Sequence, residues 1–150
     1  EGLDEHYLAY RLGQTAYLVE GLHDAGIPVV LPPGGHAVYV DAGSFLPHIA
    51  RDEYPGQALS IELYLEGGIR GVELGSVAFA YSDPETGAKH YPLMELVRLA
   101  IPRRMYTQAH MDFVIETFKR IAERKDAING YRITYAPELL RHFTATFEPL

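Results

Sequence analysis

The sequence predicts an α+β domain in which helices pack against one face of a mostly antiparallel sheet. Three helical segments alternate with groups of strands, and the strands often follow one another without the crossover helix that a parallel sheet needs. Hydrophobic residues make up 47% of the sequence and charged residues 22%, which is typical of a folded globular domain. With 150 residues the chain is long enough to bury one core, so we expect a single domain over residues 1–150.

The first half of the chain contains two of these helices. Apolar side chains recur at helical spacing in the first, and Gly26 with Pro28 ends it. The second begins near Pro55 and ends at Gly67-Gly68, because proline suits a first turn and glycine a C-terminal cap. The predicted elements are a helix over 3–23, strands over 29–31 and 36–41, a loop over 43–54, a helix over 57–66 and an extended segment over 69–80.

The second half contains the third helix, with strands on both sides of it. Thr107 is a suitable N-cap for this helix, and Asn129-Gly130 is a suitable stop. The predicted elements are a turn over 83–87, a strand over 95–101, a helix over 107–128, strands over 131–135 and 143–147, and a short helical segment over 137–140 between those strands.

Composition and charge disfavour several classes of function. The formal net charge is -7 and the isoelectric point is near 5.4, whereas a nucleic-acid partner requires basic surface. No apolar run approaches the roughly 20 residues that span a bilayer, so we expect no membrane partner. Cysteine is absent, which excludes disulfides and fits a cytoplasmic protein. The histidines show no metal-ligand spacing, so we expect no metal site.

Arg98 is the most informative single residue. In a strand over 95–101, Met94, Leu96, Arg98 and Ala100 share one face because side chains alternate, and Arg98 is the only charge on that apolar face. A buried guanidinium needs an anion beside it, or it costs several kcal/mol. Either another residue or the carboxylate of a ligand could supply that anion, and the residues alone leave both alternatives open.

Six segments carry motifs in a fixed order along the chain. They are YLAYRLGQTAYLVEGL (7–22), PPGGHAVYVDAG (32–43), LPHI (46–49), QALSIELYLEGGIR (57–70), LVRLAIPRRMYTQAHMDF (96–113) and LLRHFTATFE (139–148). Together they resemble the β-eliminating lyases that use pyridoxal 5'-phosphate, the family of the tryptophanases and tyrosine phenol-lyases. The resemblance covers nearly the whole chain.

The resemblance implies a fold and a place in a larger protein. It implies the small C-terminal domain of an aminotransferase-type enzyme, known as fold type I, so the chain is expected to be a C-terminal fragment of a longer lyase. Residues 1–26 are then a long linking helix that leaves the cofactor-binding domain, and residues 27–150 form the small α+β domain.

The resemblance also implies roles for particular side chains. Arg98 matches the arginine that grips the carboxylate of the amino-acid substrate, a role that suits the fork of a guanidinium. His142 and Phe143 match a pair that lines the pocket for the aromatic leaving group, where tryptophanases carry His-Phe and phenol-lyases carry Phe-Phe. Leu74 stands where phenol-lyases place an arginine, and together with Gln108 it favours the tryptophanase type.

The remaining candidates are a histidine and the lysines. His36 follows Gly34-Gly35, which permit an unusual backbone, and is either incidental to a rigid turn or a supporting residue of the site, as the family match implies. Lys89 lies in a polar turn region, and two further lysines lie on the charged end of a helix. None suits a Schiff base, so we expect the aldimine lysine, and with it every catalytic residue, to lie outside this chain.

These expectations define one function and two alternatives. The intact enzyme would convert L-tryptophan and water to indole, pyruvate and ammonia, with pyridoxal 5'-phosphate as cofactor and a monovalent cation such as potassium. The expected partners are the amino-acid substrate, the N-terminal cofactor domain of the same parent and further copies of it in a homotetramer. The alternatives are a tyrosine phenol-lyase and a folded fragment without catalytic function.

Overall fold

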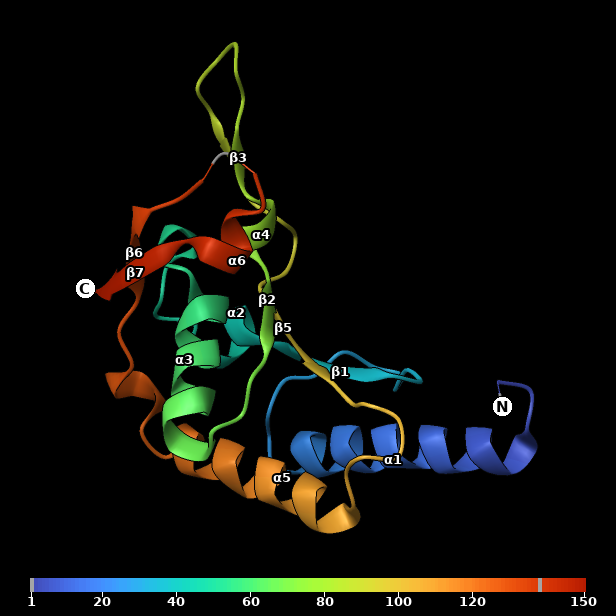
Figure 1. The fold of residues 1–150 in the computed structure, drawn as a ribbon. Helices are drawn as coiled ribbons and strands as arrows, with labels where there is room; N and C mark the ends of the chain where they lie inside the picture. The colour runs from blue at the N-terminus through green and yellow to red at the C-terminus, as the bar shows by residue number, and fades with distance from the viewer. Residues whose placement is uncertain (1, 138) are drawn as a thin grey trace.

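A computed structural model describes residues 2–137 and 139–150 of the chain (Figure 1). Its helices are α1 (Glu5–Asp24), α2 (Ala42–Phe45), α3 (Pro55–Gly67), α4 (Ser76–Phe79), α5 (Gln108–Ala122) and α6 (Arg141–Thr144), with 3-10 turns η1 (Arg51–Glu53) and η2 (Lys125–Ala127). Its strands are β1 (Ala37–Asp41), β2 (Val72–Leu74), β3 (Tyr81–Ser82), β4 (Lys89–His90), β5 (Leu96–Ala100), β6 (Tyr131–Tyr135) and β7 (Thr146–Pro149).

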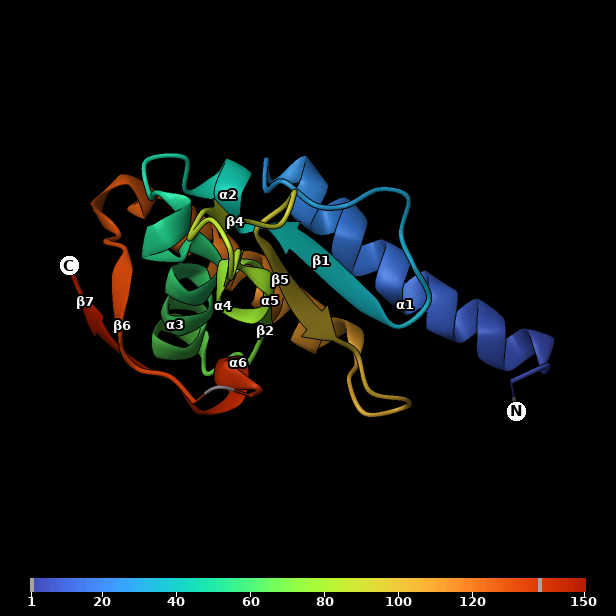
Figure 2. The same ribbon diagram turned by 90° about the horizontal axis from the view of Figure 1, so that it is seen from above.

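The principal sheet has three antiparallel strands in the order β1-β5-β2. Its register pairs Val40 with Val97 and Val38 with Leu99, and these four side chains are buried on one face. Helices α1, α3 and α5 pack on that face (Figures 1 and 2). The other two strand pairs, β3-β4 and β6-β7, are also antiparallel. The α+β prediction is therefore confirmed.

The hydrophobic core fills the space between this sheet face and the three helices. Phe118 of α5, Leu63 of α3 and Leu22 of α1 are fully buried there. Helices α1 and α5 approach closely at Gly21, where a β-carbon would lie 2.3 Å from Cδ1 of Ile115. Burying a large apolar side chain contributes roughly 1.5–3 kcal/mol, so these contacts are the main reason that the helices stay on the sheet.

Only the C-terminal half of α1 belongs to this core. Asp4 caps the helix by accepting a hydrogen bond of 2.8 Å from the backbone N–H of Tyr7. Thr15 and Leu18 are buried, whereas Tyr10 in the N-terminal half is 49% exposed, and this half extends beyond the sheet (Figure 1). Among the described helices, α1 included, none has both the length and the apolar character needed to cross a membrane.

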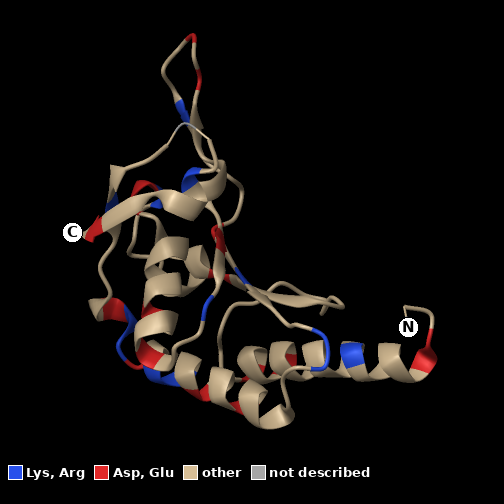
Figure 3. Ribbon diagram, in the orientation of Figure 1, with Lys and Arg blue, Asp and Glu red and all other residues tan. Residues whose placement is uncertain are grey.

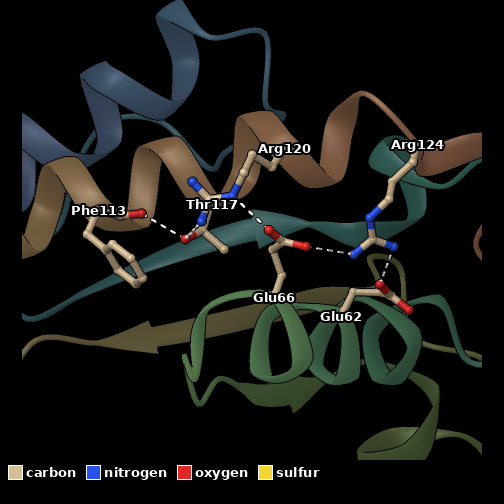
Figure 4. Close-up of polar contacts among 6 residues, drawn as sticks. All are labelled: Glu62, Glu66, Phe113, Thr117, Arg120 and Arg124. Carbon is tan, nitrogen blue, oxygen red and sulfur yellow. Dashed lines mark hydrogen bonds and ion pairs between the residues drawn. The ribbon is translucent and has the colours of Figure 1, made fainter.

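Charged residues link α3 to α5 at the surface. Arg124 donates to Glu62 at 2.6 Å and to Glu66 at 3.2 Å, and Arg120 donates to Glu66 at 2.7 Å (Figure 4). The guanidinium groups, Arg120 first, hold the pKa of the Glu66 carboxyl below its ordinary value. Figure 3 shows Lys and Arg beside Asp and Glu where these two helices meet. The contact is therefore apolar inside and ionic at its edge.

Several elements differ from the prediction. The strand predicted over 29–31 is not found, and an isolated antiparallel bridge between Val29 and Val40 stands in its place. The segment predicted as extended over 69–80 contains helix α4 after β2. The helix predicted over 107–128 ends at Ala122, because the next four residues are all charged and offer no apolar side chain to the core. The strand predicted over 143–147 begins later, and helix α6 takes in its first residues. The helical segment predicted over 137–140 includes residue 138, which lies outside the described residues.

Candidate functional site

Arg98 lies on the face of the principal sheet that the helices leave open. It pairs with Tyr39 of β1 and Val72 of β2, so the three residues form one row across the sheet. Arg98 and Tyr39 are half-buried, and Val72 is exposed. The prediction of a buried charge on an apolar face is wrong for Arg98, because the alternate residues Val97 and Leu99 are the ones that face the core.

The guanidinium of Arg98 has no counter-ion within the described part of the chain. The ion pairs found there join other residues, on α3, on α5 and just after it, and on the β6-β7 pair. A half-buried guanidinium is partly desolvated, so a carboxylate that reaches it gains more than it would at a fully exposed site. Of the two alternatives for the anion, an internal salt bridge finds no partner in residues 2–137 and 139–150, and the arrangement favours a ligand carboxylate.

Leu74 lies on the same open face, at the end of β2. It pairs with Leu96 of β5, which is two residues before Arg98 in a strand where alternate side chains share a face. Leu74 and Leu96 are both half-buried. The fold therefore brings two of the predicted site residues, Leu74 and Arg98, to one surface, where an aliphatic patch adjoins the positive charge.

His142 and Phe143 lie on α6, which packs beside α4. His142 is half-buried, Phe143 is 70% exposed, and their ring centroids are 4.1 Å apart. Both side chains line a cavity of about 510 Å³, together with Tyr64 and Leu65 of α3 and Val72 of β2. Val72 is the cross-strand neighbour of Arg98, so the cavity reaches the row that holds the guanidinium, although Arg98 and Leu74 are not among its lining residues.

His36 lies apart from this cavity, in the segment before β1. Its side chain is exposed, and its backbone carbonyl accepts hydrogen bonds from the N–H of Ile101 at 3.0 Å and from Nη2 of Arg11 at 3.4 Å. Gly34 and Gly35 do not have positive φ, so the unusual backbone expected there is not found. The supporting role of His36 stays a prediction.

The lysines lie away from the open sheet face. Lys119 donates to Glu116 at 2.7 Å on α5, the ammonium of Lys125 lies 5.6 Å from the centroid of the Phe45 ring, and Lys89 is exposed on β4. None of them lines the cavity that contains His142 and Phe143. Within the described residues, no group of three or more acidic, histidine or cysteine side chains is arranged to hold a metal ion.

Two buried carboxylates that sequence reasoning missed hold the start of α4. Glu95, 2% exposed, accepts from the backbone N–H of Ser76 at 2.8 Å and from its hydroxyl. Glu73, 6% exposed, accepts from the backbone N–H groups of Val77 at 3.1 Å and Ala78 at 3.0 Å. Burial raises the pKa of Glu73 to about 7; the amide hydrogen bonds oppose this shift, and the nearby charge of Glu95 adds to it.

The carboxylates converge on Gly75, between β2 and α4. A β-carbon at this position would lie 2.2 Å from Oε2 of Glu95 and 2.7 Å from Oε1 of Glu73, so a larger residue here would require these carboxylates to shift. The sequence did carry a signal for Glu95. It is two residues before Val97, so alternation places it on the core face and marks it as a buried charge directly before β5.

Arg141, which directly precedes His142, is the third residue that was missed. Its guanidinium donates to the backbone carbonyl of Ser76 at 2.8 Å and also to those of Val77 and Ala80. These carbonyls belong to α4 and its C-cap, and α4 is not apparent in the sequence. No local pattern could therefore reveal the partners of Arg141.

Comparison with known proteins supports the resemblance that the motifs suggested. Residues 2–117 match the Beta-eliminating lyase family. The chain is 54% identical over 149 residues to a tryptophanase of Salinibacter ruber. This match covers 99% of the chain and 31% of the length of that tryptophanase. The chain is 50% identical over 149 residues to a tyrosine phenol-lyase of Pasteurella multocida (99% and 32%) and 51% identical over 150 residues to one of Symbiobacterium thermophilum (100% and 32%).

The chain thus spans about a third of the length of the curated relatives it matches. The family match covers most of the chain, and the relatives match it almost from end to end. The observed mixture of helices and small antiparallel sheets agrees with the small domain of such enzymes. This protein therefore belongs to the β-eliminating lyase family.

Proposed function

We propose that the chain is the C-terminal, substrate-closing domain of a pyridoxal-phosphate-dependent tryptophanase, which converts L-tryptophan and water to indole, pyruvate and ammonia. The observation that carries this proposal is the guanidinium of Arg98, which lies on the open sheet face with no counter-ion among the described residues. Membership of the β-eliminating lyase family and 54% identity to a tryptophanase support it.

Each end of the substrate has its own set of side chains in this proposal. Arg98 binds the α-carboxylate through two parallel hydrogen bonds, which fixes the end that all amino-acid substrates share. His142 donates or accepts a hydrogen bond at the indole, and Phe143 packs on its ring. Leu74 supplies an apolar wall, which suits indole better than a phenol hydroxyl. His36 supports the site from the segment before β1.

The residues of this chain do not fit the covalent attachment of pyridoxal phosphate. Lys89, Lys119 and Lys125 lie away from the open sheet face and from the cavity of His142 and Phe143. The cofactor is the electron sink of such eliminations, and we infer that its lysine and its phosphate contacts belong to the part of the relatives' length that this chain does not match. This chain contributes binding, orientation and the exclusion of water.

Closure of the small domain is the motion that we infer for it. Helix α1 (Glu5–Asp24) serves as the linking helix predicted over residues 1–26, and the small domain predicted over 27–150 moves over the cofactor domain and excludes water from the site. The N-terminal half of α1 extends beyond the sheet and leaves Tyr10 and Leu12 about half exposed, which supports a contact with another part of the parent. Family membership further supports a homotetramer, a monovalent cation such as potassium and a cytoplasmic location.

Tyrosine phenol-lyase is the second candidate, because relatives with that name are 50% and 51% identical to the chain. The experiment that decides is an assay of the full-length enzyme with pyridoxal phosphate, measuring indole from L-tryptophan and phenol from L-tyrosine. We expect indole release to dominate, and Leu74→Arg to increase phenol release relative to indole release. Phenol as the main product of the wild type would transfer the assignment to the phenol-lyases.

The third alternative is a folded module without catalytic function. Size-exclusion chromatography of the full-length protein, with an absorbance scan for the bound cofactor, separates it from both enzymes. A protein that binds pyridoxal phosphate and releases indole or phenol is a lyase. A folded protein that does neither would contradict the proposal.

A further inference from the structure

Helix α6 is too short and too exposed to hold His142 and Phe143 in place by itself. It has four residues, none of which is buried. Leu140 enters it with φ 54°, a left-handed conformation that is unfavourable for a residue with a side chain. The orientation of the two rings therefore depends on contacts that α6 makes with its surroundings.

The guanidinium of Arg141 makes the polar contacts that attach α6 to α4. Its Nη2 atom donates to the carbonyl of Ser76 at 2.8 Å and to that of Ala80, and its Nε atom donates to the carbonyl of Val77. The carbonyl of Ser76 also accepts the backbone N–H of Ala80 at 3.1 Å, and the carbonyls at the C-terminal end of a helix attract positive charge. Arg141 therefore ties the start of α6 to α4 at three carbonyls, which run from the first residue of α4 to its C-cap.

The opposite end of α4 is tied to the sheet. Ser76 is held by Glu95 through both its backbone N–H and its hydroxyl. Glu95 directly precedes β5, the strand that carries Arg98. Hydrogen bonds thus run from β5 through Ser76 to Arg141, and they connect the strand that carries Arg98 with the helix that carries His142 and Phe143.

We propose that Arg141 is a positioning residue, which sets the orientation of His142 and Phe143 relative to Arg98 through α4. The proposal rests on the function proposed above, in which Arg98 holds the carboxylate and the two rings meet the leaving group. Arg141 itself touches neither end of the substrate. Its effect is on selectivity: an aromatic leaving group requires the rings in one place, and a small leaving group does not.

An arginine is required here because its donors point in several directions from one plane. A lysine presents a single ammonium on a flexible stem and cannot reproduce a fork that serves three carbonyls. The conservative variant therefore separates positioning from charge alone. If only a positive charge at the end of α4 mattered, Arg141→Lys would restore the wild-type properties.

The test compares Arg141→Ala and Arg141→Lys in the full-length enzyme with a matched control, Arg132→Ala. Arg132 pairs with Glu148 in the neighbouring β6-β7 hairpin and does not line the cavity of His142 and Phe143, so its removal controls for the removal of a surface arginine. Hydrogen–deuterium exchange without substrate is the first readout. We expect faster exchange in residues 76–80 and 141–145 of the Arg141→Ala protein, and wild-type exchange there in the control.

Selectivity is the second readout. In Arg141→Ala we expect kcat/KM for L-tryptophan to fall about 10- to 100-fold, and kcat/KM for an S-alkyl cysteine to fall less than about 3-fold, since small displacements penalise the more demanding leaving group. Arg141→Lys should recover little of this activity. Combined with His142→Phe, Arg141→Ala should cost much less than it does alone, because the two act on one group.

The outcomes that would overturn the proposal are distinct from those that would overturn the function. Unchanged exchange in α4 and α6, an equal decrease for both substrates, full rescue by lysine, or additivity with His142→Phe each rejects Arg141 as a positioning residue. A wild-type enzyme that releases neither indole nor phenol rejects the proposed function, and the assignment of Arg141 with it.

Discussion

Glu95 and Arg98 carry opposite charges within a few residues of each other, and alternation along β5 sends them to opposite faces of the sheet. Glu95 faces inward, where the N–H and hydroxyl of Ser76 offset the loss of water. Arg98 faces outward and makes no ion pair with the residues that the structure describes. The carboxylate of Glu95, directly before β5, thus holds α4 on the sheet, whereas the guanidinium of Arg98 in β5 can bind a ligand.

Removal of the Arg98 guanidinium should affect every amino-acid substrate. In the full-length enzyme, Arg98→Ala eliminates a two-point interaction with the carboxylate, so we expect kcat/KM to fall by about 2–5 kcal/mol in transition-state stabilisation. Arg98→Lys should restore little of this, because a point charge does not replace the fork. Steady-state kinetics checks both variants, and near-normal kinetics of the alanine variant would return Arg98 to a structural role.

His142 should act on one class of substrate. We expect His142→Phe to lower indole release from L-tryptophan while changing elimination from an S-alkyl cysteine less, because that leaving group needs no interaction with an aromatic ring. The expected change in selectivity is about 1–3 kcal/mol, the scale for removing one hydrogen bond from a site built around it. An equal decrease for both substrates would mean that His142 holds the domain together.

At the scale of elements, α4 is the joint between the sheet and α6. It is four residues long, too short to persist by itself, and side chains from other elements hold both of its ends. Glu73 at its start also makes it sensitive to pH, because this carboxyl is buried with a pKa of about 7.

The stability of the chain should therefore fall between about pH 4.5 and 7. Glu73 binds its proton more tightly in the folded state, where its pKa is about 7, than in the unfolded state, near 4.5. Its favourable contribution is complete below pH 4.5 and is lost as the pH rises through 7, which amounts to about 3 kcal/mol. When the free energy of unfolding is measured by urea denaturation at several pH values in this range, it should change less with pH for Glu73→Gln than for the wild type.

The exposed Glu116→Gln is the matched control for that series. Its side chain is 57% exposed and pairs with Lys119 at the surface. The same chemical change there should therefore leave the pH dependence of the unfolding free energy close to that of the wild type. A Glu73→Gln protein whose stability follows pH as the wild type does would show that another group titrates.

At the scale of the whole molecule, the elements predicted from the sequence are those whose conformation depends mainly on their own residues. The helix over 5–24, the strand over 96–100 and the start of α5 at Gln108 follow from local periodicity and caps. Helices α4 and α6 do not, because the distant residues Glu95 and Arg141 hold α4, and α6 in turn is held by its contact with α4. The motifs led to Arg98, Leu74, His142 and Phe143, whereas the residues that link them became visible only in the fold.

The isolated chain should not behave as an enzyme. Mixed with pyridoxal phosphate, residues 1–150 should stay colourless after dialysis and release no indole, since none of the three lysines lies near the proposed site. Absorbance spectroscopy and an indole assay check this. A stable visible band that maps to Lys89, Lys119 or Lys125 would contradict the inference that the cofactor lysine lies elsewhere.

The close approach of Glu73 and Glu95 to Gly75 affects which substitutions this protein can accumulate. Every amino acid one nucleotide away from a glycine codon carries a β-carbon, and at this position that atom would fall 2.2 Å from Glu95 and 2.7 Å from Glu73. A first mutation at position 75 therefore requires these carboxylates to leave their hydrogen bonds with α4, unless one of them has already been shortened or removed. In a library of all single substitutions we expect every change at position 75 to lower stability, and a prior Glu95→Asp change to reduce the cost of alanine there. The cost of changing any one of these three positions therefore depends on which of the others has changed first.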